Sequence, residues 1–200
     1  MAAVQQSALE PRCYIDHHGV LDSGYPSMLD EMNSFVIAMD QLAVSMHVLS
    51  YRPPHDAWKT MQQFDDACII DVFDSITFTS YRTAQEHSGF ASLSIEPRYW
   101  QPRWSPEGAT SEPIEYEVFD GGKEEYIRML DNGTTTFFVD DKWKTIEAVK
   151  QTMPNVIGIE FRRHSFHSPH TSCLHVTTLP NLHSAIRNAI GIQMFANTTL

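Results

Sequence analysis

The chain has 200 residues, of which 42% are hydrophobic and 20% are charged, enough for one domain with its own core. Aromatic residues make up 11%, and the 9 glycines and 11 prolines are ordinary numbers, so the composition excludes a collagen-like or largely disordered chain. The 14 basic and 25 acidic residues give a net charge of −11, which disfavours nucleic acid and anionic membranes as partners. We therefore expect a single domain over residues 1–200 that binds neither.

The three cysteines, Cys13, Cys68 and Cys173, are odd in number and far apart in the sequence. Two of them lie inside apolar, strand-like runs, which favours reduced, buried thiols over disulfides. No apolar run reaches the roughly 18 residues of a membrane span. Residues 1–12 lack the basic start and apolar middle of a signal peptide, so we expect a cytoplasmic protein.

The first eighty residues alternate between short apolar runs and segments with helical spacing of apolar residues. The pattern predicts in turn a strand over 13–15, an amphipathic helix over 28–42, a strand over 46–49, a short helix over 58–64, and one or two strands within 67–80.

The alternation weakens and then resumes in the second half of the chain. Residues 83–120 contain four prolines among aromatic residues and are expected to form an irregular insertion or, at most, a small cap. The pattern then predicts a helix over 123–130, a strand over 135–139, a helix over 143–153, a strand over 156–159 and a final helix over 182–190. Strands and helices that alternate with short joins favour an α/β fold with a doubly wound, Rossmann-type parallel sheet.

Polar residues follow three of the predicted strands. Asp16 and Ser50 end the first two, and the pair Asp140 and Asp141 ends a later one. Ligands of doubly wound sheets bind beyond the carboxyl ends of the strands, so these side chains are expected to converge there. Clustered carboxylates suit Mg²⁺, and a hydroxyl and a lysine would complete a phosphate site. The alternative is that Asp16 and Asp140 are merely turn residues, a common place for Asp.

Several segments together resemble the haloacid dehalogenase-like (HAD) hydrolase superfamily. Residues 13–21, Cys-Tyr-Ile-Asp-His-His-Gly-Val-Leu, resemble its first motif, an apolar strand followed by Asp-x-Asp-Gly. Residues 46–50 are similar to the second motif, an apolar strand ending in Ser or Thr, and Gly-Lys at 122–123 is similar to the third. Residues 137–141, Phe-Phe-Val-Asp-Asp, resemble the fourth motif, and residues 174–186 resemble the closing strand and helix.

The resemblance covers most of the chain outside 83–120 and implies a mechanism. Asp16 would be the nucleophile that attacks phosphorus and forms an aspartyl-phosphate, a use of carboxylate that general chemistry allows. Mg²⁺ would be held by Asp16, by the backbone carbonyl of His18, and by Asp140 or Asp141. Water would then hydrolyse the intermediate.

The resemblance also implies where a small phosphorylated substrate binds. Ser50 and Lys123 would bind the transferring phosphoryl group, whose charge is stabilised by donors and cations. Tyr51 and Arg52 continue the second motif and are assigned to the substrate site with Ser50. Cap insertions select substrates in this family, so residues 83–120 are expected to contribute.

Two of these assignments have an alternative within the sequence. The tripeptide Ser-Tyr-Arg occurs twice, starting at Ser50 and at Ser80, so either serine can supply the hydroxyl. We favour Ser50, because it follows Asp16 after one strand and one helix. Lys142 lies just beyond the Asp pair and competes with Lys123, but a lysine one turn past a strand end is more often solvated.

One position departs from the family's pattern. The family's phosphatases carry a second Asp at position 18, which protonates the leaving group and activates water, and this chain has His18. Imidazole has an ordinary pKa of about 6.5, so acid and base roles are available to it. A neighbouring Mg²⁺ would repel the imidazolium and weaken it as an acid. Two hypotheses follow: a magnesium-dependent phosphohydrolase, or a catalytically weakened or inactive HAD-fold binding protein.

A second group of potential ligands lies near the end of the chain, at His164, His167, His170, Cys173 and His175. Histidines three apart can bind zinc, but a proline at 169 interrupts the run and the spacing matches no strong zinc signature. The spacing therefore favours a solvated loop over a zinc site.

Overall fold

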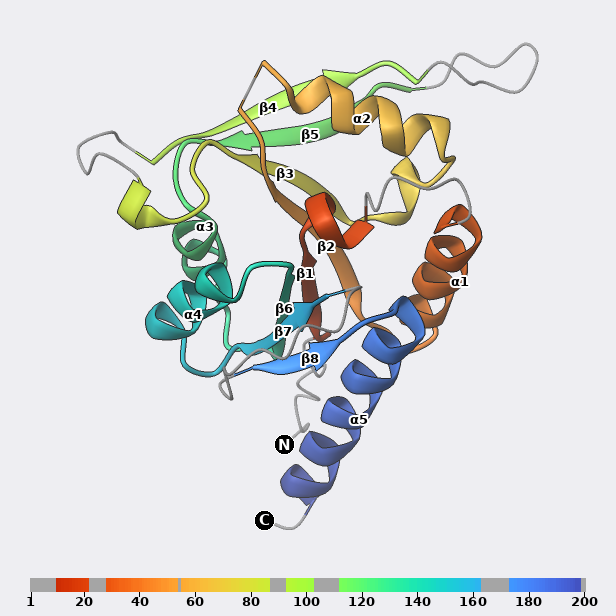
Figure 1. Cartoon of the computed structure of the whole chain (residues 1–200), viewed down its shortest axis with the longest axis vertical. Coiled ribbons are helices and arrows are strands. Elements are labelled where there is room, and N and C mark those ends of the chain that lie inside the picture. The colour runs from red at the N-terminus through yellow and green to blue at the C-terminus, as the bar shows by residue number, and fades with distance from the viewer. Residues whose placement is uncertain are drawn as a thin grey trace, which may run out of the picture.

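An eight-stranded sheet forms the centre of the molecule (Figure 1). The computed structural model describes residues 10–21, 28–53, 55–86, 93–102, 112–162 and 173–198. The strands are β1 (Arg12–Ile15), β2 (Ser45–Tyr51), β3 (Ser75–Thr79), β4 (Ile95–Trp100), β5 (Ile114–Phe119), β6 (Thr136–Asp140), β7 (Ile157–Phe161) and β8 (Leu174–Val176). They run in the order β4-β5-β3-β2-β1-β6-β7-β8. Every neighbouring pair is parallel except β4 with β5, so the predicted α/β class is confirmed and the sheet is compatible with a Rossmann-like fold.

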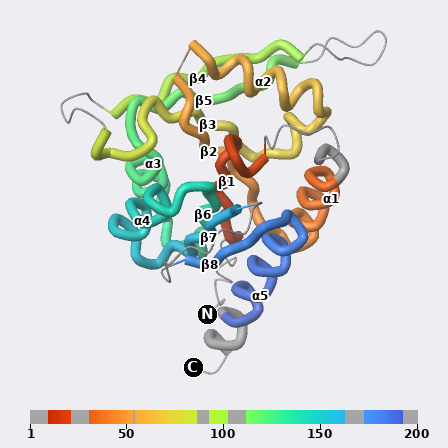
Figure 2. The backbone as a smooth tube through the Cα atoms, in the orientation of Figure 1, coloured from red at the N-terminus to blue at the C-terminus, as the bar shows by residue number. Residues whose placement is uncertain are grey.

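Helices cover both faces of this sheet. They are α1 (Met28–Asp40), α2 (Ala57–Asp66), α3 (Lys123–Met129), α4 (Trp143–Thr152) and α5 (Leu179–Thr198), with short turns η1 (His17–Leu21), η2 (Ile70–Val72) and η3 (Ala84–Glu86). Figure 2 shows α1 and α5 side by side on one face and α3 and α4 together on the other. Within the ranges described, no helix combines the length and apolarity needed to cross a bilayer.

Alternating side chains of the central strands build one core on each face. Cys13 and Ile15 of β1 pack in the cluster that includes residues of α1, α2 and α5, whereas Tyr14 packs in the cluster formed with α3 and α4. Strands covered on both faces need apolar residues at successive positions. The fully buried β6, Thr-Phe-Phe-Val-Asp, has three successive apolar residues between Thr136 and Asp140, which explains why it could be predicted as a strand.

The order of the strands creates a crevice next to β1. From β1 the chain builds outward through β2, β3 and β5 on one side, and it then returns to add β6, β7 and β8 on the other side. β1 therefore lies between β2 and β6, and the direction of winding changes there. Such a switch point is where open parallel sheets bind ligands, beyond the carboxyl ends of the strands.

The prediction of an irregular insertion over 83–120 is wrong where the structure describes it. β4 and β5 form an antiparallel pair that extends the sheet, with Ile95 opposite Phe119. The misleading signal was Pro97, which is tolerated because β4 is an edge strand and needs fewer backbone donors. Residues 87–92 and 103–111 of this segment lie outside the described part of the chain.

The prediction over 67–80 is correct for its second half. The strand β3 begins only at Ser75, and the preceding apolar residues form the short turn η2. Cys68 lies between α2 and that turn in left-handed backbone, with φ of 53°, and it is exposed rather than buried. Cys13 is buried and Cys173 is partly buried, and all three are free thiols.

Candidate functional site

Three neighbouring strands deliver the predicted polar side chains to one edge of the sheet. Asp16 directly follows β1, Ser50 is the penultimate residue of β2, and Asp140 is the last residue of β6. The Ser50 hydroxyl donates a hydrogen bond of 2.7 Å to Oδ1 of Asp16, and both side chains are buried. Asp16 and Asp140 share Lys123 as an ion-pair partner. The predicted convergence of these strand ends is therefore confirmed.

Lys123 joins the two carboxylates. Its Nζ lies 3.0 Å from Oδ2 of Asp16 and 2.7 Å from Oδ2 of Asp140, and only 1% of its side chain is exposed. Lys123 is the first residue of α3, where the helix dipole disfavours a cation. The two carboxylates compensate for this position, so Lys123, rather than the partly exposed Lys142, is the buried lysine of the site.

Close backbone packing fixes the start of α3. Gly122 precedes Lys123, and a Cβ at that glycine would lie 2.4 Å from the backbone nitrogen of Ala84. The same Ala84 nitrogen donates a hydrogen bond of 2.5 Å to Oε1 of Glu124, the second residue of the helix. The segment that follows β3 is thereby held against α3, which brings Arg82 to the site.

The buried charges of the site are not balanced. Burial raises the pKa of Asp140 to about 7, with Lys123 opposing the shift and Asp16 adding to it. Burial disfavours the charged form of Lys123, but the carboxylates of Asp140 and Asp16 outweigh it and raise the pKa of the lysine. Two buried carboxylates thus face one fully buried ammonium group, while the partly exposed Asp141 beside them lies 3.7 Å from the ammonium of Lys142. The buried part of the site carries excess negative charge.

The carboxylates also satisfy a geometric requirement for a metal ion. Asp16, Asp140 and Asp141 each offer an oxygen, and these oxygens lie within 4.8 Å of one another. Among the described residues, Oδ1 of Asp141 is buried without a hydrogen-bond partner, and its cationic neighbour Lys142 lies 3.7 Å away. An all-oxygen ligand set with excess negative charge fits a hard divalent cation such as Mg²⁺.

The turn η1 packs directly on this group. Gly19 has φ of 81°, and a Cβ there would lie 2.6 Å from Oδ2 of Asp141, so glycine is required for both conformation and space. His18 precedes it in extended backbone and has an exposed side chain. Its backbone nitrogen lies 3.4 Å from Oδ1 of Asp16. The residue that departs from the family's pattern therefore lies beside Asp16 and faces solvent.

A small pocket opens between these groups. Its volume is about 30 Å³, room for an ion or a water molecule but little more. It is lined by Asp16, His18, Tyr51, Arg82, Lys123, Asp140 and Lys142. A wider cleft of about 570 Å³ adjoins it and shares Arg82 and Lys142. The small pocket contains the two buried carboxylates, whereas the wider cleft is lined by basic and acidic side chains: Arg82, Lys142, Lys144, Arg162, Glu86, Asp141 and Glu147.

The structure separates the two Ser-Tyr-Arg segments. Ser50 touches Asp16, whereas the backbone of Ser80, at the end of β3, pairs with Phe119 of β5, so Ser50 is the serine of the site. Tyr51 lines the pocket as predicted, but Arg52 is not among the lining residues. Sequence reasoning missed Arg82, the arginine of the second tripeptide, whose guanidinium lies 5.3 Å from the centre of the Tyr51 ring. The repeated tripeptide was the signal that could have identified it.

The predicted histidine group is only partly visible. His164, His167 and His170 lie outside the described residues. Cys173 and His175 lie at the start of β8, together with Glu160 of β7.

No known protein family, curated protein or solved structure matches this chain. The function is therefore inferred from the geometry and charge of the site itself.

Proposed function

We propose that this protein is a magnesium-dependent phosphohydrolase of the HAD type, which acts on small phosphorylated molecules through an aspartyl-phosphate at Asp16. The observation that carries the proposal is the position of Lys123, buried between Asp16 and Asp140 at the carboxyl edge of a parallel sheet. This arrangement supplies a fixed carboxylate, a fixed cation and an adjoining cleft in one place.

Asp16 is held in position for attack through both of its oxygens. Ser50 donates to Oδ1, and Lys123 contacts Oδ2. In the proposed reaction a carboxylate oxygen of Asp16 forms a bond to phosphorus while the ester P–O bond breaks, and the leaving oxygen takes the electron pair. Water then attacks the phosphorus of the aspartyl-phosphate, which releases inorganic phosphate and restores Asp16. Lys123 and Ser50 lie where they can also stabilise the charge on the transferring group.

Asp16, Asp140 and Asp141 would hold the Mg²⁺, with the backbone carbonyl of His18 as a further ligand by resemblance to the family. When bound, the ion supplies positive charge that offsets the negative charge of the phosphoryl oxygens. The backbone of Lys142 helps to position these metal ligands, because its N–H donates a 2.8 Å hydrogen bond to Oδ1 of Asp140.

The adjoining cleft is the proposed site for the rest of the substrate. The 30 Å³ pocket is too small for more than the reacting group, whereas the cleft of about 570 Å³ has the size of a small-molecule site. Arg82 and Lys142 stand where the two meet, so a phosphate entering from the cleft passes between cations. Trp143 lines the cleft and offers an aromatic surface for an apolar or planar part of the substrate.

A second function is favoured by His18. The pocket lining has no carboxylate at that position, where the exposed imidazole of His18 takes its place. If imidazole does not protonate the leaving group, the protein is a weakened or inactive member that binds a phosphorylated ligand without turning it over.

The two functions are separated by measuring phosphate release from an aryl phosphate. The phosphohydrolase requires Mg²⁺-dependent release that chelation abolishes and that Asp16→Asn lowers at least about 10³-fold, as expected for loss of a nucleophile. Asp71→Asn, which changes an exposed carboxylate, is the matched control and retains activity. Release that persists in folded Asp16→Asn contradicts the proposal.

His18→Asp distinguishes the alternatives at the same position. A fall in activity identifies His18 as a working acid-base residue, because general acid-base help contributes about 10² to 10⁴ in rate. If the native chain shows no turnover and His18→Asp makes it active, the native protein is the weakened or inactive binding protein.

A further inference from the structure

A second group of ligand-type side chains lies at the opposite end of the sheet from β4. Glu160 belongs to β7, and Cys173 and His175 belong to the segment that begins β8. Side chains two apart on a strand point to the same face, so Cys173 and His175 share a face of the sheet. β7 and β8 are parallel with Glu160 directly opposite His175, which places the carboxylate on that face as well.

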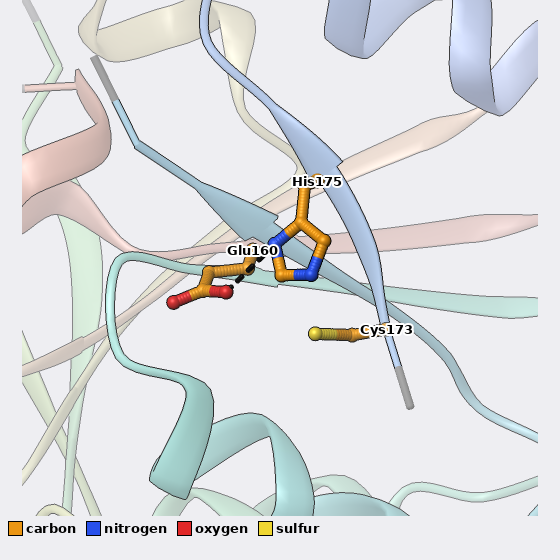
Figure 3. A group of neighbouring side chains, drawn as sticks. All are labelled: Glu160, Cys173 and His175. Atoms are coloured by element: carbon orange, nitrogen blue, oxygen red, sulfur yellow. Dashed lines mark ion pairs between the residues drawn. The ribbon is translucent and has the colours of Figure 1, made fainter. Parts of the chain in front are cut away.

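Figure 3 shows the result: the carboxylate and the imidazole face each other, and the sulfur of Cys173 points into the space beside them. Nδ1 of His175 lies 2.8 Å from Oε2 of Glu160, and the guanidinium of Arg162 contacts Oε1. One donor atom from each of the three residues lies within 4.8 Å of the other two.

Glu160 is the unusual member of the group. Its side chain is 0% exposed, although a glutamate is seldom fully buried without compensation. Arg162 at Oε1 and His175 at Oε2 compensate its charge, and each carboxylate oxygen keeps a further lone pair. A buried carboxylate that lies beside an imidazole and a thiol can therefore also serve as a metal ligand.

We propose that Glu160, Cys173 and His175 bind a zinc-class transition-metal ion, which fastens the edge strand β8 to β7. Oxygen, sulfur and nitrogen donors of this kind bind Zn²⁺ at about 2.0 to 2.3 Å. Tetrahedral ligands at those lengths lie about 3.4 to 3.7 Å apart. Metal binding would therefore lengthen the 2.8 Å distance between Glu160 and His175 slightly and bring the sulfur of Cys173 closer to both. The side chain of His175 is 39% exposed, which leaves solvent access for water as a fourth ligand.

The chemistry of this group differs from that of the pocket around Asp16. Thiolate and imidazole select zinc-like ions, whereas the all-oxygen group suits Mg²⁺. A nucleophilic thiol is the competing interpretation, but burial, and then Glu160, raise the pKa of Cys173, which opposes thiolate formation without a metal. The zinc site stands on residues of β7 and β8 and does not depend on the proposed phosphohydrolase.

Cobalt titration of the metal-free full chain tests the site, because a thiolate bound to Co²⁺ gives a charge-transfer absorption that oxygen ligands do not give. The expected result is one equivalent of Co²⁺ bound with this absorption, and its displacement by Zn²⁺, which binds such sites more tightly. Cys173→Ser and His175→Asn remove ligands and should weaken binding by at least about 100-fold, the upper end of what loss of a supporting group costs. Cys68→Ser and His55→Asn, which alter an exposed thiol and an exposed imidazole, should leave the absorption unchanged.

Two outcomes overturn the proposal: no thiolate absorption in the native chain, or the same absorption in folded Cys173→Ser. If the ligand variants do not fold, the rate of alkylation of Cys173 tests the site instead. In the Cys68→Ser background, one equivalent of Zn²⁺ should slow alkylation of Cys173 at least about tenfold, since bound thiolate is protected. An unchanged rate of alkylation refutes the site.

Discussion

Asp140 carries an electrostatic cost in the metal-free protein, and Asp140→Asn should remove it. Burial, and to a smaller extent the carboxylate of Asp16, raise the pKa of Asp140 from 3.8 to about 7 against the opposing effect of Lys123. Between these two values the unfolded chain is ionised and the native carboxyl holds its proton, so the native state loses stability as pH rises. At pH 7 the difference amounts to about 4 kcal/mol. Asparagine is neutral at every pH, as the protonated carboxyl is, and the pKa of about 7 already includes the attraction of Lys123, so the variant should gain about 4 kcal/mol at pH 7.

Urea unfolding of chelator-treated protein at pH 5, 6 and 7 measures this effect. The advantage of Asp140→Asn should be about 4 kcal/mol at pH 7, about 3 kcal/mol at pH 6 and about 2 kcal/mol at pH 5, and it should vanish below about pH 4. Mg²⁺ should stabilise the native chain and have little effect on the variant, because ligand binding to the native state raises its stability. Asp71→Asn, at an exposed position, should change stability by less than about 0.5 kcal/mol at every pH. A variant less stable than the native chain at pH 7, or a difference independent of pH, refutes the electrostatic argument.

Two further predictions concern packing and thiol chemistry. Gly122→Ala should destabilise the protein by about 1 to 3 kcal/mol in thermal or urea unfolding, because its Cβ would lie 2.4 Å from the backbone of Ala84. Gly191→Ala, in open space on α5, should be neutral or stabilising, and equal losses in both would contradict the packing argument. Cys68 is exposed, whereas burial raises the pKa of Cys13 to about 12, so a thiol reagent at pH 8 should modify Cys68 first and Cys13 only on unfolding. Prompt reaction of Cys13 in the native state would show that β1 is not buried as described.

The parts of the fold that sequence predicted well are those where burial on both faces leaves a continuous apolar run. β1 and β6 are such strands, and each is followed by a polar residue at the sheet edge. The convergence of Asp16 and Asp140 followed from this, because parallel strands end at the same edge. The spatial order of the strands is a tertiary property, and only the structure shows that β1 lies between β2 and β6.

The failures have physical causes as well. β4 is exposed along most of its length and contains Pro97, so it has neither the apolar run nor the clean alternation of an ordinary strand. Arg82 reaches the pocket because the chain after β3 packs on Gly122, a contact between residues about 40 apart that no local pattern encodes. Glu160 was missed for the same reason, since its partner His175 lies on another strand.

Trapping of the covalent intermediate shows whether Asp16 is the nucleophile. The chain is incubated with an aryl phosphate and Mg²⁺, quenched in acid, reduced with borohydride and mapped by peptide mass spectrometry, so that an aspartyl-phosphate is recorded as homoserine. We expect homoserine at position 16, none without Mg²⁺, and none in Asp16→Asn. An unmodified Asp16 in a chain that releases phosphate, or a phosphorylated residue elsewhere, would contradict it.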